Sequence, residues 1–385
     1  MPAADHPLAS QIPRPSSRPA TVIDPDIFWD LFRPEGSPMK IDDYLNSDLP
    51  QIGLHVISFT DRTVVTIFFP HTLGDAMAQK ALLDAWLLVL NGRADDVVAP
   101  RSGDTGPDPL TELGMHPEVP HDLADRQMGL LQLGRYGLGN ALSFVGAQEN
   151  RMMCVPGAFI SRLRSDMIAE LQKEPASADG NGHFLSEGDV LCAWCTRLAL
   201  IQLPPGSKRT VMLQIAKDMR DTLKVDLFKD DEGGAPYLGN AIGFVNVLIP
   251  ANEVLDQPLS HTALAIRRAI TQLGSRPQIE AFTALWRQGY GRMPPIFGDP
   301  GMLMLTYSNW CKAKLFKLDF SAAIRTPGVE NARPGIPKYI QNNQSGLILP
   351  NGYPIIGKDA DGNFWLSSYL PKGFWAKFEE ELEKY

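Results

Sequence analysis

The chain has 385 residues, of which 44% are hydrophobic and 21% are charged, and its formal net charge at pH 7 is −8. This length and composition are typical of a globular protein with two domains. The acidic balance disfavours a nucleic-acid or anionic-membrane partner, and no apolar run is long enough to cross a bilayer. We therefore expect a cytoplasmic protein without nucleic-acid or membrane partners.

Residues 1–25 are rich in proline and serine and show neither the apolar core of a signal peptide nor helical periodicity. We interpret them as a flexible arm. An apolar cluster follows within residues 26–45, and we expect it to cover a neighbouring surface. Its members are Phe28, Trp29, Leu31 and Phe32.

Two strands are predicted at residues 52–59 and 63–69, where β-branched and aromatic residues flank a short polar turn. The second run is short and ends at Pro70, which is typical of a buried strand. A helix is predicted from about Met77, because apolar residues recur at helical spacing until the stop signal Asn91-Gly92.

The loop between the second strand and this helix contains His71 and Asp75. Rigid elements on both sides fix such a loop, and imidazole titrates at about pH 6.5, so His71 is a candidate to accept a proton from an alcohol or amine. Gly74 permits a tight turn that aims the Asp75 carboxylate away from the histidine, at a cation that pins the loop.

The His-x-x-x-Asp spacing alone is weak evidence, because it also occurs at His121 and Asp125. That second pair lies in a polar stretch broken by prolines, with no strand before it, and we interpret it as a surface loop. A chance match is the simpler explanation of spacing by itself. The strand, glycine and helix around His71 favour a site there.

The chain divides into two halves. Residues 26–125 form the first, residues 126–150 are interpreted as the crossover linker, and residues 151–385 form the second. The second half is predicted to open with a strand and a helix, and residues 176–183 are interpreted as a flexible loop.

Ser186 and Asp189 have the spacing of a capping box before a helix. Cys192 and Cys195 on that helix invite a metal or redox hypothesis, but no second cysteine pair stands at ligand spacing. We expect core cysteines and no metal site. On a later helix, the adjacent arginines of residues 267–268 are interpreted as a solvated face.

Arg220 follows a predicted strand and is a candidate partner for Asp75, although the bare sequence also allows a surface charge. Gly239 is expected to permit a close backbone approach, and Asn240 to bond nearby main chain. No glycine spacing here fits a dinucleotide-binding fingerprint. Further strands are predicted at residues 302–307 and near the C-terminus, before a final helix at residues 374–382.

Five segments, in this order, resemble the BAHD acyltransferases, and especially their fungal secondary-metabolite branch of the trichothecene acetyltransferase type. Any one match is weak, whereas five in sequence are specific. The matching segments are residues 42–59 leading to the HxxxD motif at 71–75, residues 187–197, Asp218-Met219-Arg220, residues 237–241, and Ser308-Asn309-Trp310 followed by Asp319-Phe320.

The resemblance implies an α/β fold of two related two-layer domains of the chloramphenicol-acetyltransferase-like type, with the motif histidine facing a channel between them. It implies transfer of an acyl group, expected to be acetyl, from acyl-CoA to a hydroxyl, less readily an amine, of a small hydrophobic metabolite by a monomeric enzyme. Acyl-CoA is then a co-substrate, and no cofactor is bound. The implied roles are catalysis for His71 and Asp75, structural support for Arg220 and Asp319, and acyl-CoA contact for Ser308 and Trp310.

Two departures from the family pattern stand out. The family's DFGWG signature is replaced by residues 319–323, which keep only the aspartate and phenylalanine. The segment before the motif is also short, so we expect an incomplete first domain. A non-catalytic binding protein is therefore the alternative hypothesis. A condensation-type relative from peptide-assembly lines is disfavoured, because Pro70 stands where those proteins carry a second histidine.

Overall fold

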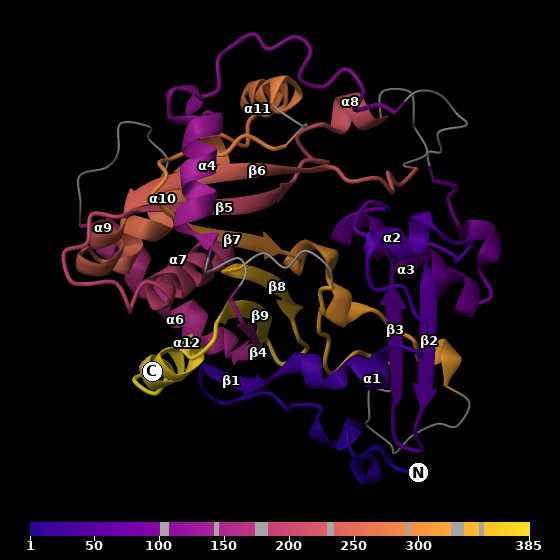
Figure 1. Ribbon diagram of the computed structural model, residues 1–385. Coiled ribbons are helices and arrows are strands. Elements are labelled where there is room, and N and C mark those ends of the chain that lie inside the picture. Colours follow the sequence, from indigo (N-terminus) through magenta and orange to yellow (C-terminus); the bar gives the residue numbers. More distant parts are fainter. Residues whose placement is uncertain are drawn as a thin grey trace.

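The computed structural model describes residues 1–100, 108–141, 146–173, 184–228, 235–289, 293–324, 335–345 and 350–385. Within these residues the strands form a seven-stranded sheet and a two-stranded sheet, with helices packed beside them (Figure 1). The predicted α/β class is confirmed. The predicted loop at residues 176–183 lies outside the described residues.

The large sheet has the order β1-β4-β9-β8-β7-β5-β6. β7 pairs in parallel with both β5 and β8, and the other neighbours are antiparallel. The strands are β1 (Ala20–Ile23), β4 (Gln148–Val155), β5 (Thr210–Asp218), β6 (Ile242–Pro250), β7 (Leu303–Asn309), β8 (Gly352–Lys358) and β9 (Phe364–Pro371).

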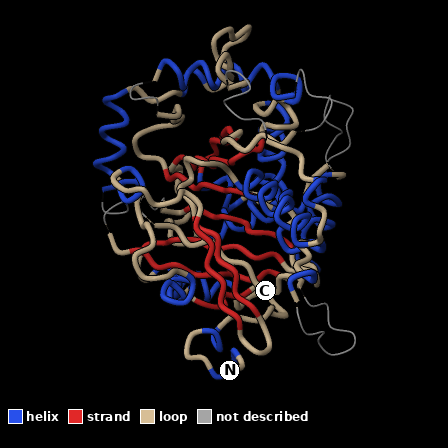
Figure 2. Tube along the Cα trace, turned by 90° about the vertical axis from the view of Figure 1, so that its right-hand side faces the viewer, coloured by secondary structure: helices blue, strands red, loops and turns tan. Residues whose placement is uncertain are grey.

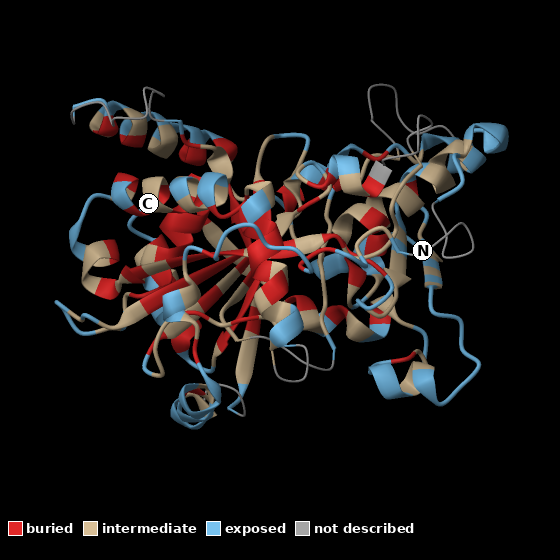
Figure 3. Ribbon diagram, turned by 90° about the horizontal axis from the view of Figure 1, so that it is seen from above, coloured by how far each residue is buried: buried red, intermediate tan, exposed pale blue. Residues whose placement is uncertain are grey.

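Helices cover one face of this sheet and bury its main core, as the concentration of buried residues in Figure 3 shows. The four that contribute most are α6 (Gly157–Leu171), α7 (Glu187–Ala199), α10 (Leu259–Gln272) and α12 (Phe374–Leu382). The remaining helices of this part are α4 (Leu130–Gly139), α8 (Lys224–Phe228), α9 (Ala251–Asp256) and α11 (Arg276–Gln288). α4 lies on the opposite face, where Tyr136 packs against Met212 and Met302.

The start of α7 explains one correct and one wrong prediction. Ser186 and Asp189 form the predicted capping box, in which each side chain accepts a hydrogen bond from the other residue's backbone N–H. The Asp189 carboxylate also forms an ion pair with Arg267, which donates to Ser186 as well. The prediction of a solvated face was therefore wrong for Arg267, because a buried carboxylate one helix away needs a cation.

The cysteines of α7 lie in the core, as predicted. Cys192 is 4% exposed and Cys195 is fully buried, and burial raises the pKa of both thiols. Among the residues that the structure describes, no group of three or more His, Cys, Asp or Glu side chains is placed to hold a metal ion.

The interpretation of residues 1–25 as a flexible arm was wrong at its end. Residues 20–23 form the edge strand β1, which pairs antiparallel with β4. Thr21, Val22 and Ile23 are β-branched, and this strand signal was outweighed by the proline-rich composition around it. The predicted linker at residues 126–150 likewise contains α4 and the start of β4.

The smaller sheet is an antiparallel hairpin of β2 (Gly53–Ser58) and β3 (Thr63–Phe68), followed by α3 (Ala76–Leu90). In Figure 2 its two strands run across the strands of the large sheet. The prediction of a buried strand was wrong for β3, because Val65 is 42% exposed beside Val56 at 48%. Ile67, farther along the same face, packs on the cluster that contains Leu83 of α3.

Short helices α1 (Trp29–Phe32) and α2 (Ile41–Leu45) precede the hairpin. Phe28 and Leu31 are buried against Ala3 and Ala9, and Ile57 of β2 packs on the same cluster. The apolar cluster expected from the sequence thus joins the N-terminal residues to the hairpin. Within the described residues, no helix has the length and apolar character that crossing a membrane requires.

His121 was predicted to lie in a surface loop, and this prediction was wrong. Its side chain is 4% exposed, and its ring stacks on Phe297 with centroids 4.9 Å apart and planes 9° apart. Burial lowers the pKa of His121, partly offset by the charge of Asp122. Polar composition and prolines hid this contact, because the ring's partners come from distant segments.

The lowered pKa makes protonation of His121 unfavourable in the folded state. Folding stability should therefore fall as pH drops below about 6.5, where the unfolded histidine binds a proton more readily. We expect the melting temperature to decrease more in wild type than in His121→Phe when the pH is lowered from about 7.5 to about 5.5. The phenylalanine keeps an aromatic ring but cannot bind a proton. Thermal unfolding at both pH values measures this, and parallel losses in the two proteins would rule it out.

Candidate active site

The loop between β3 and α3 is fixed by the start of the helix. Asp75 is the N-cap residue of α3, and its Oδ1 accepts hydrogen bonds of 3.0 Å from the backbone N–H groups of Met77 and Ala78. These bonds satisfy two of the free N–H groups at the helix start. The carboxylate that caps the helix is therefore also held at a defined position.

The same carboxylate forms a two-bond ion pair with Arg220, just beyond the end of β5. Arg220 Nη1 donates to Oδ2 at 2.9 Å and Nη2 donates to Oδ1 at 3.0 Å. The Asp75 and Arg220 side chains are 4% and 13% exposed. The backbone N–H of Ala241 also donates to Oδ2, at 2.9 Å. Two parallel charge-assisted bonds fix both distance and orientation, so the small and large sheets are tied together here.

Arg220 also donates to three oxygen atoms of neighbouring residues in the large-sheet part of the protein. Nη2 donates to the carbonyl oxygens of Tyr237 at 3.1 Å and Gly239 at 2.9 Å, and Nη1 donates to Asp218 Oδ1 at 3.1 Å. The Tyr237 hydroxyl donates to Asp108, and burial, followed by the charge of Asp108, raises the pKa of Tyr237 to about 12. One guanidinium thus connects the motif loop with the segment that leads into β6.

His71 lies at the exposed end of this loop. Its backbone carbonyl accepts a hydrogen bond of 2.9 Å from Asn240 Nδ2, so its main chain is anchored to the segment that Arg220 holds. Within the described part of the chain, its ring nitrogens make no hydrogen bond. The imidazole therefore keeps both its donor and its acceptor for a ligand.

Gly74 lets the motif loop pass close to a neighbouring segment. It does not adopt an unusual backbone angle, since it is not among the described glycines with positive φ. A Cβ at this position would lie 2.5 Å from the carbonyl oxygen of Leu238 and 2.7 Å from the Cβ of Ala78. Only glycine lets the loop pass so near the segment before β6.

Gly74→Ala should therefore force the loop away from Leu238 and lower both stability and any activity that depends on His71. Overpacking of this kind costs about 1–3 kcal/mol. Gly134→Ala is the control, because a Cβ at Gly134 inside α4 meets nothing within 4 Å and alanine favours a helix. Denaturant unfolding of both variants checks the difference. Equal stability of Gly74→Ala and wild type would contradict the close packing.

Ser308 and Trp310 lie at the end of β7, next to β5. Trp310 Nε1 donates a hydrogen bond of 2.8 Å to Ser308 Oγ, and both side chains are half-buried. Trp310 also packs between clusters that include Leu83 of α3 and Trp365 of β9. The pair thus stands where the two sheets meet.

Asp319 is exposed and stays within its own turn. Its Oδ1 accepts a hydrogen bond of 2.9 Å from the backbone N–H of Ser321, and it also pairs with the Ser321 hydroxyl. These bonds lower the pKa of Asp319. The neighbouring Phe320 ring lies 5.5 Å from Trp86 of α3. The structure therefore brings His71, Asp75 and Arg220 together and places Asp319 apart from them, beside the Phe320 ring that packs on α3.

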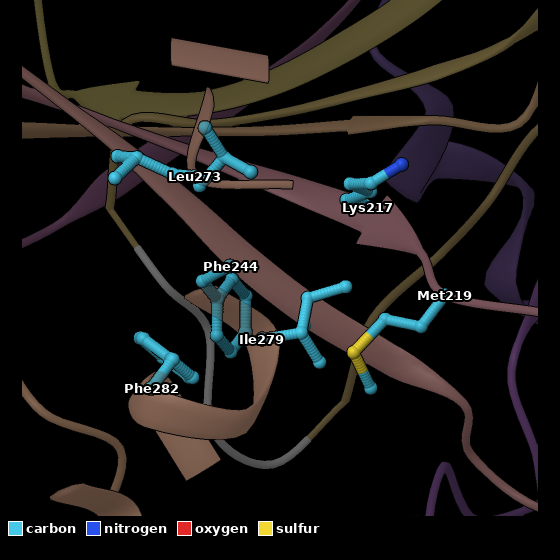
Figure 4. A pocket seen from close by; sticks show the side chains of 8 residues that line it. Lys217, Met219, Phe244, Leu273, Ile279 and Phe282 are labelled. Atoms are coloured by element: carbon cyan, nitrogen blue, oxygen red, sulfur yellow. The ribbon is translucent and has the colours of Figure 1, made fainter. Parts of the chain in front are cut away.

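A shallow cleft lies beside the end of β5 (Figure 4). Its walls are apolar side chains from β6, from α11 and from the residues just after β5 and α10, and Lys217 lies beside them. Burial, followed by the charge of Lys312, lowers the pKa of Lys217. Lys312 itself pairs with Asp221 at 2.7 Å.

Solved structures of other proteins share this fold. The fold is similar to that of the TRI101 protein of F. sporotrichioides, described in complex with coenzyme A and T-2, with a TM-score of 0.63 and 17% identity over 88% of this chain and 70% of that chain. This likeness is one of fold, a mixed α/β architecture with a large sheet.

The curated relatives give the family, although no family model matches the chain. Transcriptional regulator calD of Penicillium decumbens is 36% identical over 98% of this chain and 77% of its own length. Acetyltransferase adrJ of Penicillium rubens is 33% identical over 99% and 78%. Other fungal relatives are named acetyltransferases and O-acyltransferases.

The chain belongs to the fungal BAHD-type acyltransferases. The predicted family is confirmed, and so is the predicted enzyme class, an acyl-CoA-dependent O-acyltransferase. Sequence reasoning missed Asp218 as a second carboxylate on Arg220. Its position two residues before the arginine, at a strand end, was the available signal.

Proposed function

We propose that this protein transfers an acyl group, expected to be acetyl, from acyl-CoA to a hydroxyl, less readily an amine, of a small hydrophobic secondary metabolite. The observation that carries the proposal is the motif loop, which Asp75 and Arg220 lock while the His71 ring makes no hydrogen bond within the described residues. A fixed backbone with a free imidazole suits a general base.

In this reaction a His71 ring nitrogen accepts the proton of the acceptor hydroxyl as the oxygen attacks the thioester carbonyl. A tetrahedral oxyanion forms and then collapses, breaking the carbon–sulfur bond and releasing CoA thiolate, which takes the proton back from the imidazolium. No covalent acyl-enzyme is required. Burial raises the pKa of each cysteine thiol, which opposes a thiolate nucleophile.

The other predicted residues take supporting roles. Asp75 and Arg220 hold the loop, and their buried two-bond pair supports this assignment. Ser308 and Trp310 contact acyl-CoA, supported by their place where the two sheets meet. Asp319 acts at a distance, by shaping the turn whose Phe320 ring packs on Trp86 of α3.

We further place the protein in the cytoplasm as a monomer that works on acyl-CoA and a small acceptor, without bound cofactor, nucleic acid or membrane. The net charge of −8 supports the exclusion of polyanionic partners. Because CoA is itself an anion, its phosphates need a local basic patch.

Calorimetric titration of the purified protein with acetyl-CoA and with CoA tests the donor site without knowledge of the acceptor. Saturable micromolar binding of both is expected. A folded sample that binds neither would overturn the proposal. It would favour the alternative, a non-catalytic binding protein. One observation supports that alternative: the relative from Penicillium decumbens is named a transcriptional regulator.

A further inference from the structure

The tip of the motif loop is a tight turn. The backbone N–H of Leu73 donates a hydrogen bond of 2.9 Å to the carbonyl oxygen of Pro70. His71 and Thr72 are the central residues of this turn, and both are exposed. Asp75, which lies beyond the turn, is buried. The ion pair of Asp75 therefore fixes the base of the loop, and the tip that carries the imidazole needs a contact of its own.

Asn240 supplies this contact. Its Nδ2 donates a hydrogen bond of 2.9 Å to the carbonyl oxygen of His71, which belongs to the central peptide of the turn. The two residues are 169 positions apart in the sequence. Among the residues that the structure describes, no other hydrogen bond joins positions 71 and 72 to the large-sheet part of the protein. One side-chain amide thus holds the tip.

The backbone of Asn240 is itself held on both sides. The carbonyl oxygen of Gly239 accepts a hydrogen bond of 2.9 Å from Arg220 Nη2. The backbone N–H of Ala241 donates a hydrogen bond of 2.9 Å to Asp75 Oδ2. Both partners of the buried ion pair therefore fix the peptide segment from which the Asn240 side chain extends. A side chain on a fixed backbone can set the position of the turn precisely enough for chemistry.

The remaining atom of the amide indicates what the side chain contributes. Asn240 Oδ1 is buried, and within the described residues it has no hydrogen-bond partner. Turning the amide over would place this oxygen against the His71 carbonyl oxygen, so the donor has to face the turn. One bond made and one buried acceptor left unsatisfied add little to stability. The effect of this side chain should therefore appear in the position of His71.

We propose that Asn240 is a positioning residue for the general base. Its amide holds the turn tip so that the His71 imidazole lies within reach of the acceptor hydroxyl, and it acts on the reaction only through His71. This inference rests on the proposed acyl transfer. A displacement of about 1 Å in a reacting group can lower a rate by about 100-fold, so one hydrogen bond at the tip is enough to matter.

Asn240→Leu tests the proposal, because leucine has a similar size but neither the donor nor the unpartnered acceptor. The probes are acetyl-CoA with cyclohexanol, menthol and 2-phenylethanol, and kcat is measured with the alcohol that wild type acetylates fastest. We expect kcat to fall at least about 10-fold, with acetyl-CoA affinity and melting temperature close to those of wild type. A purely structural role would lower the melting temperature together with kcat. Asn240→Ala repeats the test with a smaller side chain.

Asn140 provides a matched control. Its Nδ2 also donates a hydrogen bond of 2.9 Å to a backbone carbonyl, that of Tyr136 at the end of α4. Asn140 is half-buried, as Asn240 is. Asn140→Leu removes the same kind of bond away from the motif loop and should leave kcat near that of wild type.

Nuclear magnetic resonance tests the bond without any substrate. In protein labelled with carbon-13 at the histidine carbonyl carbons, the His71 signal is the one that disappears in His71→Ala. This signal should move in Asn240→Leu, because the carbonyl loses its hydrogen bond, and stay in place in Asn140→Leu. A His71 carbonyl signal that is the same in Asn240→Leu and wild type would contradict the anchoring.

A double-mutant cycle tests whether Asn240 acts through His71. In the His71→Ala background, Asn240→Leu should cause no further loss of kcat, because residues that act as a unit are not additive. An equal loss in both backgrounds, or wild-type kcat in Asn240→Leu, would overturn the inference. Acetylation of none of the three alcohols by an enzyme that binds acetyl-CoA would overturn it as well. Failure to bind acetyl-CoA in calorimetry would instead show that the proposed acyl transfer is wrong.

Discussion

Replacing His71 with alanine is expected to lower turnover by about 10²- to 10⁴-fold, which is the usual contribution of a general base. Acetyl-CoA affinity should stay close to that of wild type, because in the proposed reaction the His71 ring takes a proton from the acceptor and does not bind the donor. The fold should also survive, since only the His71 backbone carbonyl takes part in a described hydrogen bond. Steady-state kinetics and calorimetry on the same preparation measure both quantities.

A matched histidine provides the control. His55 lies on β2 opposite Thr66, in the strand next to the motif strand. His55→Ala removes an imidazole from the same sheet and should leave turnover near that of wild type. If His71→Ala kept near wild-type turnover, or if the two variants lost activity equally, the assignment of the base would be wrong.

Asp75→Asn should lower both stability and turnover. The asparagine keeps the shape of the side chain but leaves Arg220 with Asp218 as its remaining carboxylate, at 3.1 Å. Removing one partner of a buried ion pair costs about 3–5 kcal/mol, and the retained amide oxygen should hold the loss near the lower end of that range. Turnover falls because the loop that carries His71 is no longer fixed. Denaturant unfolding and kinetics measure the two effects.

Asp84→Asn is the control on the same helix. Its carboxylate is 50% exposed and pairs with Lys80 one turn away, an arrangement that contributes about 0.5 kcal/mol or less. A double-mutant cycle with Arg220→Met isolates the coupling between Asp75 and Arg220. A coupling near zero, or full activity and an unaltered melting temperature in Asp75→Asn, would refute the role of this ion pair.

The motif loop was predictable because its signals are local. A β-branched strand, a glycine and a periodic helix lie within one stretch, and they fix where His71 and Asp75 stand. The pairing of Asp75 with Arg220 spans 145 residues. Only the resemblance to a family singled out that arginine, because one sequence carries no record of contacts between distant segments.

The wrong predictions share the opposite cause. His121 sits in a polar stretch and Arg267 beside a second arginine, yet Phe297 stacks on the histidine ring and Asp189 from another helix pairs with the arginine. The edge strand at residues 20–23 pairs with a strand about 130 residues later, so composition alone described it poorly.

The most direct measurement of the central claim follows an isotope-labelled acetyl group from acetyl-CoA in the presence of a panel of small hydrophobic alcohols. The account predicts that wild type moves the label to a hydroxyl oxygen, that His71→Ala does so at least about 100-fold more slowly, and that no label becomes covalently attached to the protein. Label that stays on CoA with every alcohol, or that accumulates on the protein, would contradict direct acyl transfer by this chain.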